Sequence, residues 1–177
     1  MLDIRQNNEF MKDYALLKAV TLNPARHLAL NAYDHCEMVA KQAQRLAYHN
    51  GCSDEHTALL INVARVHDIG KVNGTANPSE SIKLMSHYGG FSELFFNLVK
   101  YHDINLPWYI AHNKGQTPSD KAWRKMLNKV DIKLLCLFMV ADRVDCPGGW
   151  KHNEALMWFL NEVEHRQLMV DELILLE

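Results

Sequence analysis

An apolar segment that ends in a histidine and an aspartate constrains this chain more than any other feature does. Residues 58–66 are apolar on nearly every side, which is typical of a helix at the centre of a fold. His67 and Asp68 follow the segment directly, and Gly70 with Lys71 ends it. We therefore expect the histidine and the aspartate at the rim of a core, where a metal ion could bind both side chains.

Helical periodicity runs along nearly the whole chain, and no segment shows convincing strand alternation. Asn77-Pro78 and Thr117-Pro118 mark the starts of helices, and Gly51 and Gly89-Gly90 mark stops. We expect an all-α fold with helices at about residues 6–21, 28–50, 53–67, 77–88, 92–102, 117–145 and 150–175. Residues 104–116 are expected to form a polar and aromatic loop.

The composition indicates one ordinary globular domain. The 177 residues are 48% hydrophobic and 23% charged, with a formal net charge of −2, which argues against a protein whose main role is to coat nucleic acid. The longest apolar run, residues 134–141, is far shorter than the roughly 20 residues that span a bilayer. The N-terminus has no apolar signal segment, and the four cysteines form no close pair. We therefore expect a cytoplasmic protein with reduced thiols and no membrane contact.

Two further residues are candidates for a metal site. His35 falls at the edge of the apolar stripe of the helix expected at 28–50, so we expect its side chain to face inward. The alternative is an ordinary core histidine with one hydrogen bond. Asp142 follows the apolar run 134–141, where a carboxylate is costly to bury unless it meets a cation. The alternative for Asp142 is an exposed helix end paired with Arg143.

His87 and His102 complete the set of candidate ligands. Each lies at an expected helix boundary after the His67-Asp68 pair. The alternatives are a helix-end histidine for His87 and a solvated histidine for His102. Neither residue is decisive alone, so the interpretation depends on the order of all the candidate ligands along the chain.

That order resembles the HD superfamily of metal-dependent phosphohydrolases. The resemblance covers roughly residues 28–146 and is most specific at Val66-His-Asp-Ile-Gly-Lys71 and at Ala-Asp-Arg in 141–143. Within the superfamily the sequence looks closest to the HD domain attached to bacterial tRNA nucleotidyltransferases. The resemblance implies a single HD domain, residues 1–177, built as a bundle of about six to eight helices. An N-terminal and a C-terminal helix would pack on its core.

The resemblance also implies the ligands of one or two divalent metal ions. One metal is held by the first histidine, the His-Asp pair and the late aspartate, which here are His35, His67, Asp68 and Asp142. Two-metal members use two further histidines, matched here by His87 and His102, and Asp68 would bridge the ions. Imidazole with carboxylate suits Mn, Fe, Co, Ni or Zn better than Mg alone, although Mg stays a candidate.

Such a site is expected to hydrolyse a phosphoester. A divalent metal neutralises phosphate oxygens and makes bound water more acidic. Asp68 would position the water, and Lys71 would contact a phosphate oxygen, the alternative for Lys71 being a solvated helix-end lysine. Further candidate contacts to the substrate are Arg143, His112 and Lys114. Pairing with a neighbouring aspartate is an equal alternative for Arg143.

A basic strip and the aromatic loop bear on the substrate. Lysines recur at every fourth position from Lys121 to Lys133. On one continuous helix they would form a strip near Asp142 that suits a nucleotide or an RNA end, and a solvated helix face is the ordinary alternative. Trp108 and Tyr109 in the expected loop could stack a base.

These expectations leave three functions. The first is hydrolysis of a phosphomonoester or phosphodiester, with a small-molecule phosphoester, a nucleotide or an RNA end as the substrate. The second is a non-catalytic HD-fold binding or regulatory module, because the apolar final helix could cover a core or a partner. A homo-oligomer is a separate candidate. The third is a di-iron HD-type oxygenase, which the lysine after the His-Asp pair disfavours.

Overall fold

A computed structural model describes residues 3–176 of the chain. No strand occurs among these residues, in which Thr21 and Asn31 form an isolated bridge. In chain order the elements are η1 (Ile4–Gln6), α1 (Asn8–Leu16), η2 (Leu17–Ala19), α2 (Ala32–His49), α3 (Asp54–Val66), η3 (Ile69–Asn73), α4 (Pro78–Tyr88), α5 (Glu93–Tyr101), α6 (Asn105–Asn113), α7 (Asp120–Leu127), α8 (Ile132–Ala141), η4 (Trp150–His152) and α9 (Glu154–His165). The predicted all-α class is confirmed.

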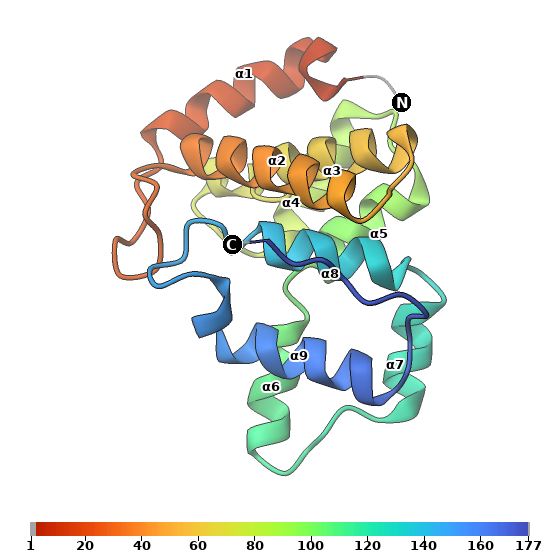
Figure 1. The fold of residues 1–177 in the computed structure, drawn as a ribbon. Helices are drawn as coiled ribbons and strands as arrows, with labels where there is room; N and C mark the ends of the chain where they lie inside the picture. Colours follow the sequence, from red (N-terminus) through yellow and green to blue (C-terminus); the bar gives the residue numbers. More distant parts are fainter. Residues whose placement is uncertain (1–2, 177) are drawn as a thin grey trace.

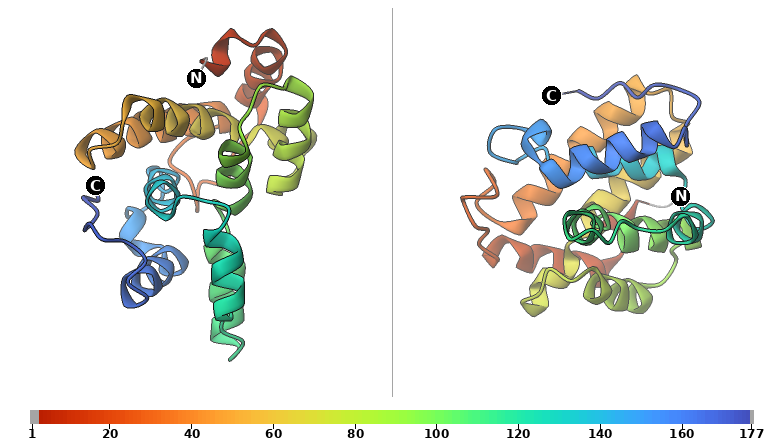
Figure 2. Two further views of the ribbon diagram at one scale, coloured as in Figure 1. Left: turned by 90° about the vertical axis from the view of Figure 1, so that its right-hand side faces the viewer. Right: turned by 90° about the horizontal axis from the view of Figure 1, so that it is seen from below.

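Helix α8 lies at the centre of this arrangement. It contacts α2, α3 and α5 on one side and α9 on the other (Figure 1). The two turned views show the same order, with α8 between α2 and α9 (Figure 2). All residues of 134–141 are buried, as expected for a helix that is apolar on all sides. Among residues 3–176, no helix combines the length and the apolar character needed to cross a membrane.

The prediction of a loop at 104–116 is wrong, because α6 occupies most of it. Pro107 lies in the first turn of α6, where a proline is tolerated. The ring of Trp108 packs against Trp123 of α7 and Phe159 of α9, with centroid distances of 4.8 and 6.2 Å. This tertiary contact stabilises the helix, and it uses the ring that was expected to stack a base.

The single helix predicted over 117–145 is two helices. The chain breaks between α7 and α8, and Asp131 caps the start of α8 by accepting a backbone hydrogen bond. Lys129 lies in the break, and its Nζ pairs with Glu93 at 2.8 Å. Lys133 Nζ donates to a backbone carbonyl oxygen at 2.8 Å. The lysines from Lys121 to Lys133 therefore do not form one continuous strip.

The first and last helices are shorter than predicted. Helix α1 ends at Leu16 and gives way to η2, while α2 begins at Ala32, after an Asn31 cap, and not near residue 28. Helix α9 ends at His165. Residues 166–176 contain no further helix and return along the bundle (Figure 1). The shorter α2 leaves residues 20–31 as a loop beside the predicted site.

Three helix ends carry the predicted ligands. His35 lies close to the start of α2, His67 is the C-terminal cap of α3, and Asp142 is the C-terminal cap of α8. Asp68 is the N-terminal cap of η3, which turns away from α3 immediately after the pair. Side chains at helix ends point into a shared space without interrupting the core.

Gly70 lets η3 pack directly on α4. A Cβ atom at Gly70 would lie 2.7 Å from the backbone nitrogen of Ser81 and 2.9 Å from the Cβ of Glu80. The Gly70 N–H donates to the Ser81 hydroxyl at 2.9 Å. The glycine that follows the His-Asp pair is therefore required by a close approach of two backbones.

Replacement of Gly70 should destabilise the fold. Gly70→Ala is expected to lower the free energy of unfolding by about 1–3 kcal/mol, because the added methyl group overpacks the contact with α4. Chemical denaturation followed by circular dichroism measures the change. The matched control Ser79→Ala, at an exposed position of α4, is expected to stay within about 0.5 kcal/mol. Equal stability of the two variants would show that the contact is not tight.

Candidate metal centre

Five of the predicted ligands meet where the three helix ends and the C-terminal end of α5, capped by His102, converge. Asp142 Oδ1 lies 3.2 Å from His35 Nε2 and 3.0 Å from His67 Nε2. Asp68 Oδ2 lies 3.6 Å from His35 Nε2 and 3.5 Å from His67 Nε2. His102 joins them, since its ligand atom lies within 4.8 Å of those of His67 and Asp142. All five residues are buried.

The backbone fixes the tautomers of two histidines. His67 Nδ1 lies 2.8 Å from the carbonyl oxygen of Ala64, and His102 Nδ1 lies 2.6 Å from that of Val99. A carbonyl oxygen only accepts, so Nδ1 carries the proton in both rings and Nε2 presents a lone pair when the rings are neutral. Both Nε2 atoms are therefore prepared as metal donors.

His35 is oriented by a carboxylate. Asp145 Oδ1 lies 3.1 Å from His35 Nδ1, at an angle that is poor for a hydrogen bond, and Asp145 itself is buried. The other oxygen of Asp145 lies 3.2 Å from Nδ1 of His27. A carboxylate behind the ring fixes the orientation of a ligating histidine and makes it a stronger donor.

Asp145 and His27 were missed as members of the site in the sequence. Asp145 follows Asp142 by one turn, and that spacing was the available signal, but it was considered only as a partner for Arg143. His27 lies just outside the apolar pattern of α2, in a loop that carries no periodicity. Its place beside His35, with ring centroids 5.0 Å apart, depends on how the loop folds back.

The carboxylates of the cluster are held ionised. Burial raises the pKa of Asp68, but the neighbouring His67 and Lys71 outweigh it and lower the pKa to about 2. Burial also opposes the ionised form of Asp142, yet Arg143 and His67 hold the pKa of Asp142 well below its usual range. Lys71 forms an ion pair with Asp68, and Arg143 forms one with Asp142.

The pKa values of His35 and His102 shift in opposite directions. Burial lowers the pKa of His35, but the contacts with Asp142 and Asp145 outweigh burial and raise the pKa to about 9. Burial lowers the pKa of His102, and the nearby charge of His67 adds to that effect. His102 is therefore neutral at pH 7, which leaves its Nε2 lone pair available.

The cluster has the charge and the donors for a divalent cation. The charged groups that line the cavity are the carboxylates of Asp68, Asp103, Asp142 and Asp145 and the cations Arg26, Lys71 and Arg143. With the imidazoles neutral, as metal ligands must be, these groups leave a formal charge of −1. His67 Nε2 is also buried, and although Asp142 Oδ1 lies 3.0 Å away, it makes no hydrogen bond of good geometry among the described residues. A buried donor atom without such a hydrogen bond and an uncompensated negative charge both fit a bound metal ion.

The cluster opens into a cavity of about 450 Å³. His35, Asp68, His102 and Asp142 line it, so a ligand in the cavity would reach the donors. Lys71 also lines the cavity, which places its ammonium group near any bound phosphate.

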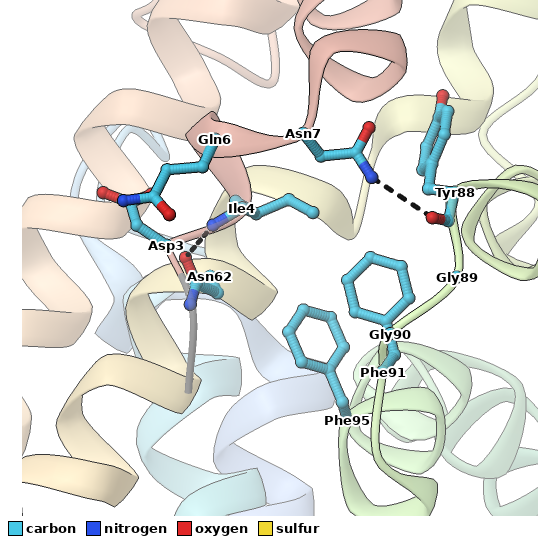
Figure 3. Close-up of a pocket in the computed structure, with 10 residues that line it drawn as sticks. All are labelled: Asp3, Ile4, Gln6, Asn7, Asn62, Tyr88, Gly89, Gly90, Phe91 and Phe95. Carbon is cyan, nitrogen blue, oxygen red and sulfur yellow. Dashed lines mark hydrogen bonds between the residues drawn. The ribbon is translucent and has the colours of Figure 1, made fainter.

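A second cavity, of about 500 Å³, is unsuited to metal chemistry (Figure 3). Figure 3 shows Ile4, Phe91 and Phe95 gathered around it. No histidine occurs among the described residues that line it, and its one carboxylate, Asp3, is paired with Arg5. The first cavity is therefore the candidate functional site.

Three predicted site residues lie outside that cavity. His87 is exposed and lies 3.4 Å from Glu9, because α4 directs the ring away from the helix ends. The ring of His112 packs near Trp158, with its Nδ1 2.9 Å from a threonine hydroxyl. Lys114 caps the C-terminal end of α6 and is exposed. The structure brings none of them to the cluster, so we leave them out of the proposed site.

The fold and the site together define a helical-bundle protein whose buried His/Asp cluster could hold a metal ion. The model of one family, the HD domain, matches residues 32–146, which is more than half of the chain. The chain therefore belongs to the HD-domain family, within the superfamily of metal-dependent phosphohydrolases. No curated protein matches the chain. The closer likeness to the HD domain of tRNA nucleotidyltransferases stays a prediction.

Asp145 should influence metal affinity without contacting the metal. Asp145→Asn is expected to weaken metal binding by about 10- to 100-fold, because an amide does not fix the protonated Nδ1 of His35 as a carboxylate does. Competition titration of the purified protein against a chelator measures the affinity. Asp54→Asn removes the same charge from an exposed position of α3 and serves as the control. Unchanged affinity in Asp145→Asn would contradict this role.

Proposed function

We propose that this protein is a metal-dependent phosphohydrolase that cleaves a phosphomonoester or a phosphodiester. The observation that carries the proposal is the convergence of imidazole and carboxylate donors at the edge of a cavity, with a buried Nε2 on His67 that makes no hydrogen bond of good geometry among the described residues. His35, His67, Asp68 and Asp142 would hold one divalent metal ion. His102 is a further donor at the cluster and would serve a second ion or an expanded ligand set.

The reaction breaks the bond between phosphorus and the ester oxygen. A water oxygen forms the new bond to phosphorus, and the departing alcohol takes up a proton, so the products are an alcohol and either inorganic phosphate, from a phosphomonoester, or a phosphomonoester, from a phosphodiester. A bound divalent ion supplies positive charge to the phosphoryl oxygens and makes water more acidic. With its low pKa, Asp68 stays ionised at neutral pH and can accept a hydrogen bond from the attacking water.

Lys71 and Arg143 supply fixed positive charge. Lys71 is bound to Asp68, and Arg143 bridges Asp142 and Asp103, with 2.7 Å from its Nη2 to Asp103 Oδ1. Both line the cavity. We propose that they contact phosphoryl oxygens while remaining attached to the carboxylates, since each guanidinium or ammonium group has further N–H donors.

The two sequence features that favoured an RNA end as the substrate, the lysine strip and the aromatic loop, do not have the expected arrangement in the structure. The lysines from Lys121 to Lys133 are divided between two helices and the break between them. Trp108 is packed against other helices, and Tyr109 donates to Glu154 at 2.9 Å. Hydrolysis of a small phosphoester is therefore the function that the geometry supports best.

Removal of a ligand should abolish both metal content and activity. The variants His67→Ala and Asp68→Ala are expected to lose the bound metal, and their activity should fall by at least about 100-fold. This loss is larger than the one typical of a residue that only orients a metal ligand. Elemental analysis of the purified protein and phosphate release from a phosphoester panel measure the two effects. His49→Ala removes an exposed histidine of α2 and should retain both properties.

The alternatives make different predictions in the same assays. A metal-loaded protein that is inert on every phosphoester would indicate the binding or regulatory module. Iron content with oxygen uptake in the presence of a polyol would indicate the oxygenase. Full phosphohydrolase activity in both His67→Ala and Asp68→Ala would end the proposal.

A further inference from the structure

Two loops form most of the part of the cavity wall that does not belong to the metal cluster. They are residues 20–31 and the segment around η4, which lie side by side (Figure 1). The Leu28 N–H donates to the carbonyl oxygen of Asp145 at 2.7 Å and ties the loops together. The polar side chains that these loops contribute to the cavity are Thr21, Asn23, Arg26, His27, His152 and Asn153.

This wall offers hydrogen-bond donors. The side-chain oxygen of Asn23 accepts from Ala25 N–H, and that of Asn153 accepts from Leu156 N–H, each at 2.9 Å. Both amide oxygens are thus used by the protein, and the NH2 groups are left for a ligand. The hydroxyl of Thr21 adds a group that both donates and accepts. Such groups suit the hydroxyl and ether oxygens of an alcohol.

No aromatic plane is available for a nucleobase. None of the described residues that line the cavity is Trp, Tyr or Phe. The His27 ring is packed edge-on against His35, at an interplanar angle of 78°, and is tied to Asp145. The His152 ring lies against Gly148, where an added Cβ would be 3.3 Å from Nδ1. Binding of single bases by proteins depends largely on stacking, and no Trp, Tyr or Phe ring among the described residues of this cavity supplies it.

Arg26 is the one cation of the cavity wall that is not committed to a carboxylate within the described residues. Lys71 and Arg143 are both paired with proposed metal ligands. Arg26 is exposed at the end of the loop and has no ion-pair partner among residues 3–176. Its guanidinium group can therefore donate to the oxygens of the alcohol portion of a substrate.

We infer that the substrate is a small phosphomonoester of a polyhydroxylated alcohol, such as a sugar phosphate, and that no nucleobase is recognised. This inference depends on the proposed function. The phosphate group would lie at the metal cluster, and the hydroxyl-bearing alcohol would contact Asn23, Arg26 and Asn153. The volume of about 450 Å³ is in the range of small-molecule sites. Hydrolysis would release phosphate and the free sugar, with the proton on the departing oxygen.

Ribose 5-phosphate and adenosine 5′-monophosphate provide the test, because they share a sugar phosphate and differ in the base. We expect the metal-loaded protein to release phosphate from ribose 5-phosphate with a kcat/KM equal to or above that for adenosine 5′-monophosphate. A lower value for ribose 5-phosphate overturns the inference, since it would show that the base contributes to recognition.

A third ester, p-nitrophenyl phosphate, distinguishes failure of the substrate inference from failure of the proposed function. Hydrolysis of p-nitrophenyl phosphate together with a preference for adenosine 5′-monophosphate would overturn the inference and leave the proposed function intact. Absence of phosphate release from all three esters by the metal-loaded protein would overturn the proposed function and the inference with it.

Arg26→Ala tests the contact to the alcohol. We expect about a tenfold loss of kcat/KM on ribose 5-phosphate, mostly through KM, because the lost hydrogen bonds contribute to binding. Lys41→Ala removes an exposed cation of α2 that does not line the cavity and should keep the original value. Equal values for the two variants would contradict the role of Arg26, and circular dichroism confirms that both are folded.

Discussion

The burial of Asp68 and Asp142 is the constraint on which the rest of the structure depends. An ionised carboxylate taken out of water costs several kcal/mol unless other charges compensate it. Here each carboxylate has its own cation, Lys71 or Arg143, and both face the nitrogen atoms of His35 and His67. The bundle therefore brings its helix ends together at a polar centre whose negative charge still exceeds what its own cations supply.

Helix ends are suited to this task for a physical reason. A residue at a helix end can leave the apolar packing of the helix, as His67 and Asp142 do, while the preceding turns stay in the core. The carbonyl oxygens of the last turn are free to accept hydrogen bonds, and they fix the rings of His67 and His102 by their Nδ1 atoms. The same geometry that ends the helix thus selects the tautomer that a metal requires.

The sequence predicted the parts of this site that local patterns determine. The apolar helix before His67, the inward face of His35 and the position of Asp142 all follow from periodicity within one helix. Helix α6 could not be predicted in this way, because it depends on contacts of Trp108 with distant helices. The interruption before Asp131 was missed because the capping aspartate was overlooked in a segment rich in helix formers. His87 and His102 have similar local settings, and only the three-dimensional path of α4 and α5 distinguishes them.

Asp145 explains why the two sides of the cavity are not independent. One of its oxygens lies against His35, and the other lies near His27 and accepts from the Ala29 N–H at 3.4 Å. A single buried carboxylate therefore orients a proposed metal ligand and anchors the loop that carries Arg26. Loops tolerate changes of sequence more readily than packed helices do. The residues that we propose to contact the alcohol can thus vary without disturbing the helix ends, provided that the loop keeps the backbone and side-chain contacts that tie it to Asp145.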